Sequence, residues 1–152
     1  MMDATEERLR ERGLRVTAPR VAVLQVLADH SHVPADMVAS AARGRVGAVS
    51  TQGIYNVLTD LVAAGLVHRI EPAGSPALYE LSSPNAHHHL ICRDCGRVTD
   101  LECEHDIESC LIPPKTHGYA GVQAEIVFWG TCPECQTHAR DGRATTARRS
   151  TQ

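Results

Sequence analysis

The sequence is poor in aromatic residues, has no long hydrophobic run and carries no excess of positive charge. Only 3% of its 152 residues are aromatic, so a hydrophobic core has to come mainly from Leu, Val, Ile and Ala. The longest stretch of apolar residues and glycine, Leu61 to Val67, is far too short to cross a bilayer. The formal net charge of −3 excludes nucleic-acid binding through overall basicity, so any DNA contact must come from a local patch.

An apolar signal segment is also missing, because residues 1–8 are mostly polar and charged, and we expect a cytoplasmic protein. In a reducing compartment, the six cysteines favour thiolate metal ligands over disulfides. The length allows one domain or two small ones. Each half would be marginally stable by itself, so zinc or a partner subunit would help to stabilise it.

The first half of the chain is predicted to form three to four helices followed by a small hairpin. Ile54, Leu58 and Leu61 recur at helical spacing after Ser50, a candidate N-cap, and Gly65 ends this helix. Helices are expected at residues 5–13, 17–29, 35–42 and 51–64, a loop at 44–47, and strands at 67–71 and 77–81. This order is the plan of a winged helix, a helix-turn-helix variant whose last full helix enters the DNA major groove.

Two identical Cys-x-x-Cys pairs, Cys92 with Cys95 and Cys132 with Cys135, frame the second half. Each pair places two thiolates on one tight turn, and two such pairs complete a tetrahedral shell that suits zinc. Residues 96–131 separate the pairs, which is wider than the usual zinc-ribbon gap of roughly 15–20 residues. Two unrelated pairs, or disulfides, are therefore the alternative to a structural zinc site.

A run of three histidines, His87-His88-His89, precedes the first pair. Imidazole is a harder ligand than thiolate and points to a second metal of a different kind. On a strand, His87 and His89 point to one face and His88 to the other, so His87 and His89 are predicted co-ligands. The alternative is a solvated polar turn.

A polar stretch at residues 82–85 is the predicted domain boundary. The predicted fold class is α+β, with an N-terminal winged helix-turn-helix domain followed by a small α/β domain that holds the four-cysteine zinc site. Beyond the boundary, strands are expected at residues 88–92, 97–101 and 122–130. The predicted organisation is a DNA-binding domain at 1–82, a hinge at 83–86, a metal-binding domain at 87–136 and a disordered tail at 137–152.

Four motifs follow one another over about residues 8–136. They are Arg15-x-Thr17-x-x-Arg20, Ser50-x-x-x-Ile54-Tyr55-x-x-Leu58-x-x-Leu61-x-x-x-Gly65-Leu66-Val67, His87-x-His89-x-x-Cys92-x-x-Cys95-Gly96 and Cys132-x-x-Cys135. Their combination resembles the ferric uptake regulator family of metal-dependent, homodimeric, winged-helix transcriptional regulators. The resemblance implies that the second domain is the dimerisation domain. Within the family, the chain most resembles the actinobacterial branch that regulates catalase-peroxidase genes. The features that carry this resemblance are Gly74-Ser75, the three histidines, Cys103, Cys110 and Trp129-Gly130.

The resemblance implies a regulatory metal site made of His32, Glu80, His87, His89 and Asp100. Mixed nitrogen and oxygen ligands suit iron(II) or manganese(II) better than an ion that prefers thiolate. His32 and Glu80 belong to the DNA-binding half and the other three to the second half. A metal that takes ligands from both domains would fix the angle between them. Only one such angle would let the two wings of a dimer meet successive major grooves.

Two further groups of residues have competing interpretations. The resemblance implies a third metal site at His88, Glu108 and His117, although Ala124 stands where relatives often have a ligand histidine. Cys103 and Cys110 are a redox pair, additional metal ligands or two ordinary thiols. On a straight helix their Cα atoms would lie about 10 Å apart, beyond disulfide reach.

The DNA contacts are predicted from the fourth helix and from two arginines. Tyr55 resembles the base-contacting tyrosine of the family, whose ring can meet a thymine methyl group. Gln52 and Asn56 are candidate base or phosphate contacts, and many relatives have Arg in place of Asn56. Arg15 and Arg20 are candidate phosphate or minor-groove contacts, with a solvated surface as the alternative.

The sequence thus predicts a homodimeric, zinc-stabilised repressor that binds a palindromic operator when its regulatory site holds iron(II) or manganese(II). Its targets would be oxidative-stress (catalase-peroxidase) genes or iron-homeostasis genes. The alternatives are a zinc-responsive regulator of the same family and a zinc-stabilised interaction module without DNA binding. A zinc deaminase is excluded because no His is followed two residues later by Glu, and because Pro133 lies inside its Cys pair.

Overall fold

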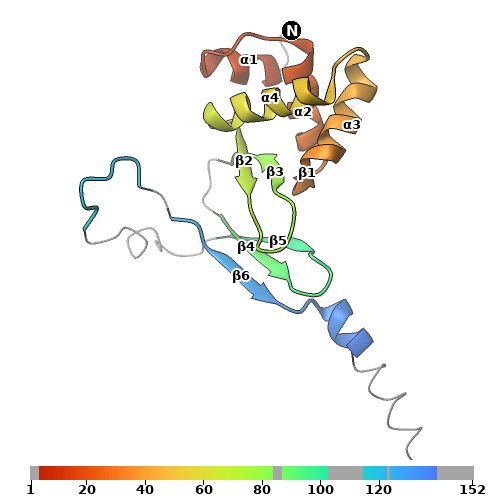
Figure 1. The fold of residues 1–152 in the computed structure, drawn as a ribbon, viewed down its shortest axis with the longest axis vertical. Helices are drawn as coiled ribbons and strands as arrows, with labels where there is room; N and C mark the ends of the chain where they lie inside the picture. Colours follow the sequence, from red (N-terminus) through yellow and green to blue (C-terminus); the bar gives the residue numbers. More distant parts are fainter. Residues whose placement is uncertain (1–3, 84–86, 103–114, 123, 140–152) are drawn as a thin grey trace, which may run out of the picture. The chain divides into compact units, whose positions relative to one another are not determined.

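The computed structural model describes residues 4–83, 87–102, 115–122 and 124–139 (Figure 1). The chain divides into two compact units, Met1–Pro84 and Asn85–Gln152. Both units contain β-sheet and the first also contains four helices, so the predicted α+β class is confirmed. No helix among the described residues is long and apolar enough to span a membrane.

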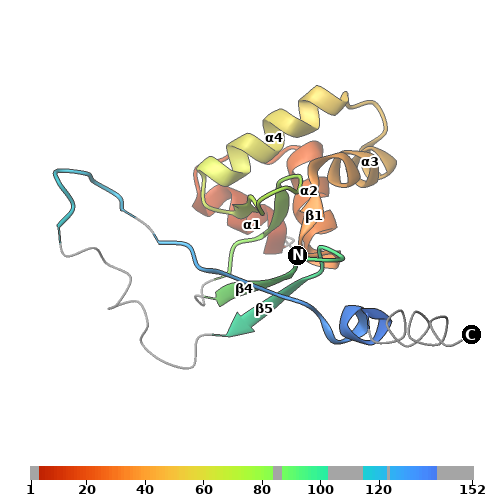
Figure 2. The same cartoon turned by 60° about the horizontal axis from the view of Figure 1, so that its bottom comes forward.

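The first unit is a winged helix built on helices and one small antiparallel sheet with strand order β1-β3-β2. Its elements in chain order are α1 (Ala4–Glu11), α2 (Ala18–Asp29), β1 (Val33–Pro34), α3 (Ala35–Val46), α4 (Thr51–Ala63), β2 (Val67–Ile70) and β3 (Leu78–Leu81). Figure 2 shows α4 lying across α2 and α3, and α4 contacts both of these helices. The wing is the hairpin of β2 and β3, which pairs Val67 with Leu81 at one end and Ile70 with Leu78 at the other.

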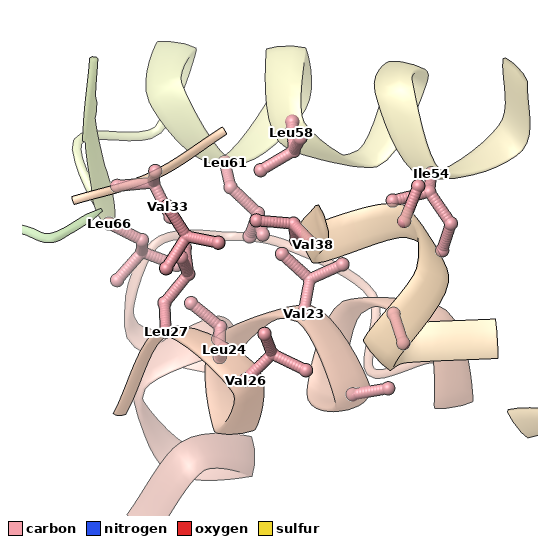
Figure 3. Close-up of a cluster of buried hydrophobic side chains, with 14 of the residues drawn as sticks. Val23, Leu24, Val26, Leu27, Val33, Val38, Ile54, Leu58, Leu61 and Leu66 are labelled. Carbon is pink, nitrogen blue, oxygen red and sulfur yellow. The ribbon is translucent and has the colours of Figure 1, made fainter. Parts of the chain in front are cut away.

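The core of this unit consists of aliphatic side chains from all four helices (Figure 3). Ile54, Leu58 and Leu61 of α4 are each at most 1% exposed, as their helical spacing predicts. They pack with Val23 and Leu27 of α2, which are also buried. The prediction of a core made from Leu, Val, Ile and Ala is confirmed for the described residues.

Two local features of this unit differ from the sequence prediction. The predicted loop at residues 44–47 is wrong, since α3 continues to Val46, whose packing against the core outweighs the low helix propensity of Gly44. The helix ends only at Gly47, which adopts a left-handed φ of 76°. The two-residue strand β1 was not predicted, and its pairing of Val33 with Tyr79 brings the preceding His32 close to β3.

Ser50 caps α4 as predicted, and its Oγ accepts a hydrogen bond of 2.9 Å from the backbone N–H of Gly53. We expect Ser50→Ala to lower the free energy of unfolding by about 1 kcal/mol, because one N–H of the first turn loses its acceptor. Thr17 is the matched control, because it stands at the N-cap of α2 without a side-chain cap hydrogen bond. Urea denaturation of the zinc-loaded protein measures both variants, and an equal loss for Thr17→Ala would contradict the capping role of Ser50.

The second unit holds a three-stranded sheet of order β5-β4-β6. Its strands are β4 (His87–Cys92), β5 (Val98–Glu102) and β6 (Val127–Gly130). β4 and β5 form an antiparallel hairpin around the Cys92–Cys95 turn, whereas β6 lies parallel to β4. The predicted strand at 122–130 is wrong before Val127, because the pairing with β4 begins at His89 opposite Val127.

The predicted tail begins too early. Residues 133–139 are helical, and Thr137 Oγ1 donates a 2.9 Å hydrogen bond to the carbonyl of Pro133 one turn back. Residues 137–139 therefore belong to an ordered turn that follows the second cysteine pair, so their assignment to a disordered tail is wrong. Residues 140–152 lie outside the described part of the chain.

Candidate metal centres and DNA-reading helix

The four predicted zinc ligands come together at one end of the second unit's sheet. Cys92 ends β4 and Cys95 lies in the following turn, while Cys132 follows β6 and Cys135 lies in the helical turn. Their four Sγ atoms all lie within 4.8 Å of one another, and no described cysteine forms a disulfide. The parallel pairing of β6 with β4 places the second pair beside the first.

The spacing of the sulfur atoms fits a tetrahedral zinc site. Four thiolates about 2.3 Å from one zinc ion would place neighbouring sulfurs about 3.8 Å apart. The Cys95 and Cys132 sulfurs are 3.7 Å apart. All four ligand positions are thiols, so the site has the composition of a closed structural centre rather than of a catalytic one.

Hydrogen bonds within the cluster shift the pKa values of two of its thiols in opposite directions. The backbone N–H of Cys132 donates to Cys92 Sγ over 3.3 Å, and with the backbone N–H of Cys95 it lowers the pKa of the Cys92 thiol to about 6. The hydrogen bond with Cys132 instead raises the pKa of the Cys135 thiol. Four neighbouring thiols cannot all ionise unless a cation offsets their charge, and zinc supplies two positive charges.

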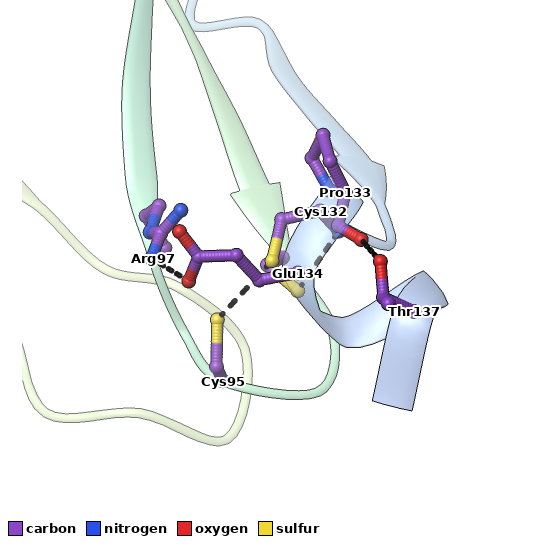
Figure 4. A network of polar contacts seen from close by, with 7 residues as sticks. Cys95, Arg97, Cys132, Pro133, Glu134 and Thr137 are labelled. Atoms are coloured by element: carbon purple, nitrogen blue, oxygen red, sulfur yellow. Dashed lines mark hydrogen bonds and ion pairs between the residues drawn. The ribbon is translucent and has the colours of Figure 1, made fainter. Parts of the chain in front are cut away.

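An ion pair joins the two halves of the cluster. Arg97 Nη2 donates to Glu134 Oε2, so a side chain from the β4–β5 turn region holds one from the second Cys-x-x-Cys (Figure 4). This bond lowers the pKa of Glu134 and raises that of Arg97. Both side chains are about half exposed or more, so the pair contributes little to stability by itself. It does place a positive charge beside the thiols of Cys95 and Cys132.

Each unit also holds a separate group of imidazole and carboxylate ligands. In the first unit, His32 Nε2 lies 2.9 Å from Glu80 Oε2, and Glu80 is only 3% exposed. In the second unit, the same Asp100 oxygen lies 3.6 Å from His89 Nε2 and 3.9 Å from His87 Nε2. Glu80 is a buried carboxylate and therefore requires a cation or hydrogen-bond donors, whereas Asp100 is exposed and faces the buried ring of His89.

The alternation along β4 separates His88 from its neighbours, as predicted. The rings of His87 and His89 meet edge to face at 4.9 Å, whereas the ring of His88 packs against Phe128 at 6.0 Å. His88 Nε2 is buried and has no hydrogen-bond partner among the described residues. Of the other residues predicted for a third site, His117 is exposed and Glu108 lies outside the described residues. Cys103 and Cys110 also lie outside them.

The exposed side of α4 carries the predicted reading residues. Gln52 Nε2 donates to Asn56 Oδ1 over 3.0 Å, so these amides are paired one helical turn apart. The Tyr55 hydroxyl donates to Asp36 Oδ1 of α3, which raises the pKa of Tyr55. The sequence did not predict Asp36 as a site residue. Its one local feature is its place as the acidic residue in the first turn of α3.

The two predicted DNA-contacting arginines have different surroundings. Arg20 donates to the carbonyl of Arg15 over 2.9 Å and to Asp60 Oδ2 over 2.8 Å, and its side chain is 18% exposed. It therefore joins α2 to α4 within the unit. Arg15 is exposed, and its DNA contact stays a prediction.

Comparisons with known proteins extend over both units. The model of the ferric uptake regulator family matches residues 11–127. The transcriptional regulator FurA of Mycobacterium tuberculosis is 43% identical over 129 residues, covering 85% of this chain and 88% of that protein. The ferric uptake regulation protein of Legionella pneumophila is 34% identical over 133 residues, covering 86% and 97%. The solved ferric uptake regulator from Pseudomonas aeruginosa with manganese is 33% identical, covers 86% of this chain and 99% of that chain, and has a TM-score of 0.68.

Proposed function

Because the chain belongs to the ferric uptake regulator family of metal-responsive transcriptional regulators, we propose that it is a homodimeric repressor switched by iron(II) or manganese(II). Its relatives are transcriptional regulators, and the chain is a regulator rather than an enzyme. The proposed DNA target is a palindromic operator, because a two-fold symmetric dimer presents two identical reading helices. The proposed target genes are those of oxidative-stress defence, such as catalase-peroxidase, or of iron homeostasis.

The two groups of imidazole and carboxylate ligands carry this proposal. His32 with Glu80 and His87 and His89 with Asp100 offer nitrogen and oxygen atoms only, the donor set of iron(II) and manganese(II). We propose that one ion takes ligands from both groups and so joins the first unit, which contains α4, to the second unit, which contains the four-cysteine centre. The zinc held by that centre would be structural, since a closed thiolate shell has no open position.

Metal-dependent DNA binding tests the proposal directly. The zinc-loaded protein is titrated with a fluorescent duplex from the region upstream of its own gene, under anaerobic conditions at buffered free iron(II), manganese(II) or zinc(II). The proposal expects iron(II) or manganese(II) to tighten binding. Tightening only by added zinc would indicate a zinc-responsive regulator instead. A duplex selected from random sequence replaces the upstream region if that region is not a target.

The reading role of α4 gives a separate prediction. Tyr55→Ala is expected to weaken operator binding by about 1–3 kcal/mol, the scale of one good base contact, while zinc content and dimerisation stay unchanged. Tyr119→Ala is the matched control, because Tyr119 is 77% exposed in the second unit. Fluorescence anisotropy at matched salt measures both affinities. Unchanged affinity of Tyr55→Ala would show that this helix is not the reader.

A further inference from the structure

We propose that Asp36 is a positioning residue that sets how selectively α4 distinguishes its operator from other DNA. This inference rests on the proposed function, in which Tyr55 reads bases. Its structural basis is the hydrogen bond from the Tyr55 hydroxyl to Asp36 Oδ1, which joins the second helix of the helix-turn-helix to the first turn of the helix before it. An exposed acid and the proposed reading tyrosine therefore act as one unit.

An uncompensated acid is unexpected at this place. In a helix-turn-helix, the helix before the reading helix crosses the DNA backbone, where negative charge repels phosphates. Asp36 is exposed, and among the described residues no Lys or Arg side chain forms an ion pair with it. By contrast, Asp60 of α4 is paired with Arg20 and Asp29 of α2 with Arg45. Within the described residues, Asp36 thus has no cationic partner on the side of α3 that meets Tyr55.

The reading helix itself has little charge with which to hold DNA non-specifically. Thr51–Ala63 contains no Lys or Arg, and its amides Gln52 and Asn56 are paired with each other. Discrimination by this helix therefore depends on the placement of neutral groups, and the ring of Tyr55 is the largest of them. A hydroxyl anchored at Asp36 fixes the direction of that ring before DNA arrives, which lowers the ordering cost of the specific complex.

Both effects of Asp36 change the ratio of operator affinity to affinity for other DNA. The hydrogen bond favours the specific complex by preorganising Tyr55. The charge repels phosphate in both complexes, but it weakens the non-specific complex most, because the affinity of that complex is essentially electrostatic. Selectivity is a difference between two affinities, so an unfavourable contact with the wrong DNA is as effective as a favourable one with the right DNA. Asp36 supplies both with one carboxylate.

Three variants separate the two effects in the full-length, zinc-loaded protein with manganese(II). Asp36→Asn keeps an acceptor and removes the charge, Asp36→Ala removes both, and Tyr55→Phe removes the hydroxyl alone. Glu7→Gln is the matched control, because Glu7 is an exposed acid in the first turn of α1. Each protein is titrated with a duplex selected from random sequence by the wild type and with a shuffled duplex of the same composition.

The hydrogen bond predicts one pattern and the charge another. Asp36→Ala and Tyr55→Phe are each expected to lose operator affinity by about fivefold or more, and the double variant that combines Asp36→Ala with Tyr55→Phe is expected to lose no more than either alone. Asp36→Asn is expected to keep operator affinity and to bind the shuffled duplex roughly two- to fivefold more tightly, with Glu7→Gln unchanged. The hydrogen bond with Asp36 also raises the pKa of Tyr55, so spectroscopic titration should show that pKa fall toward its ordinary value in Asp36→Ala.

The outcomes distinguish failure of this inference from failure of the proposed function. Additive losses in the double variant, or an unchanged ratio of the two affinities in both Asp36 variants, would overturn the role of Asp36 while leaving Tyr55 as the reader. If neither Tyr55→Ala nor any of these variants changed operator affinity, α4 would not read DNA and both would be wrong. Asp36→Asn preserves the size of the side chain, so it tests the charge even if Asp36→Ala folds poorly.

Discussion

Cys92→Ser is expected to release the structural zinc and, with it, the homodimer. Cys92 is the buried member of the cluster, 5% exposed, and its sulfur accepts the backbone N–H of Cys132. Replacing it leaves three thiolates and a weak hydroxyl ligand, and it also removes the contact that seats the second pair against β4. Zinc binding in small domains is worth about 10–16 kcal/mol and is inseparable from folding, so the loss should extend beyond the site.

Zinc per chain, measured by mass spectrometry after gel filtration, and the molecular mass in solution test this prediction. Wild type should hold one zinc per chain as a dimer, and Cys92→Ser should hold less than about one tenth of that as a monomer. Cys103→Ser is the matched control, since it removes a cysteine that is not one of the four clustered thiols. Stoichiometric zinc in Cys92→Ser, or an X-ray absorption spectrum of wild type without sulfur ligands, would contradict a four-cysteine centre.

The features that the sequence predicted well are those with a local physical signal. Helix α4 has a capping serine, an aliphatic stripe and a terminal glycine, and all three work as expected, with Gly65 at a φ of 70°. The alternation of strand β4 separated His87 and His89 from His88 for the same reason, because side-chain direction on a strand has a period of two. In these cases neighbours in sequence decide the structure.

The features that it missed depend on contacts between distant residues. No periodic pattern in the sequence indicates that β6 pairs in parallel with β4. Strand β1 is only two residues long, too short to show a pattern of its own. The hydrogen bond from Arg20 to Asp60, forty residues away, had no signal in the sequence, and the DNA contact of Arg20 stays a prediction. Asp36 was overlooked because its importance comes from Tyr55 on the following helix. Long-range pairing therefore decides which polar groups remain available for ligands.

His32→Ala and His89→Ala are each expected to abolish metal-activated DNA binding while keeping the fold, the zinc and the dimer. His32 contacts Glu80 in the first unit and His89 contacts Asp100 in the second, so each change removes one nitrogen ligand from a different unit. If one ion takes ligands from both units, losing either side should disconnect metal binding from the position of the reading helix. Neither residue belongs to the four-cysteine cluster, so the structural zinc should be unaffected.

His68→Ala is the matched control, because His68 is half-buried and lies opposite Glu80 in the β2–β3 register without being a proposed ligand. Its metal response should stay close to that of wild type. A general loss of stability from removing a histidine of the first unit would instead weaken His68→Ala and His32→Ala alike. Thermal unfolding of the three variants in the zinc-loaded state shows whether each has kept its fold.

Linkage makes the test reciprocal. If metal tightens operator binding in wild type by about 1–3 kcal/mol, operator DNA must tighten metal binding by the same factor. Anaerobic titration of iron(II) or manganese(II), with and without the operator duplex, measures both sides of this cycle. In His32→Ala and His89→Ala the two effects should vanish together, because the ion that remains bound to one unit no longer distinguishes the DNA-bound state. If His32→Ala alone kept the full coupling, the regulatory ion would be held entirely by the second unit, and the proposed switch through a shared metal would be wrong.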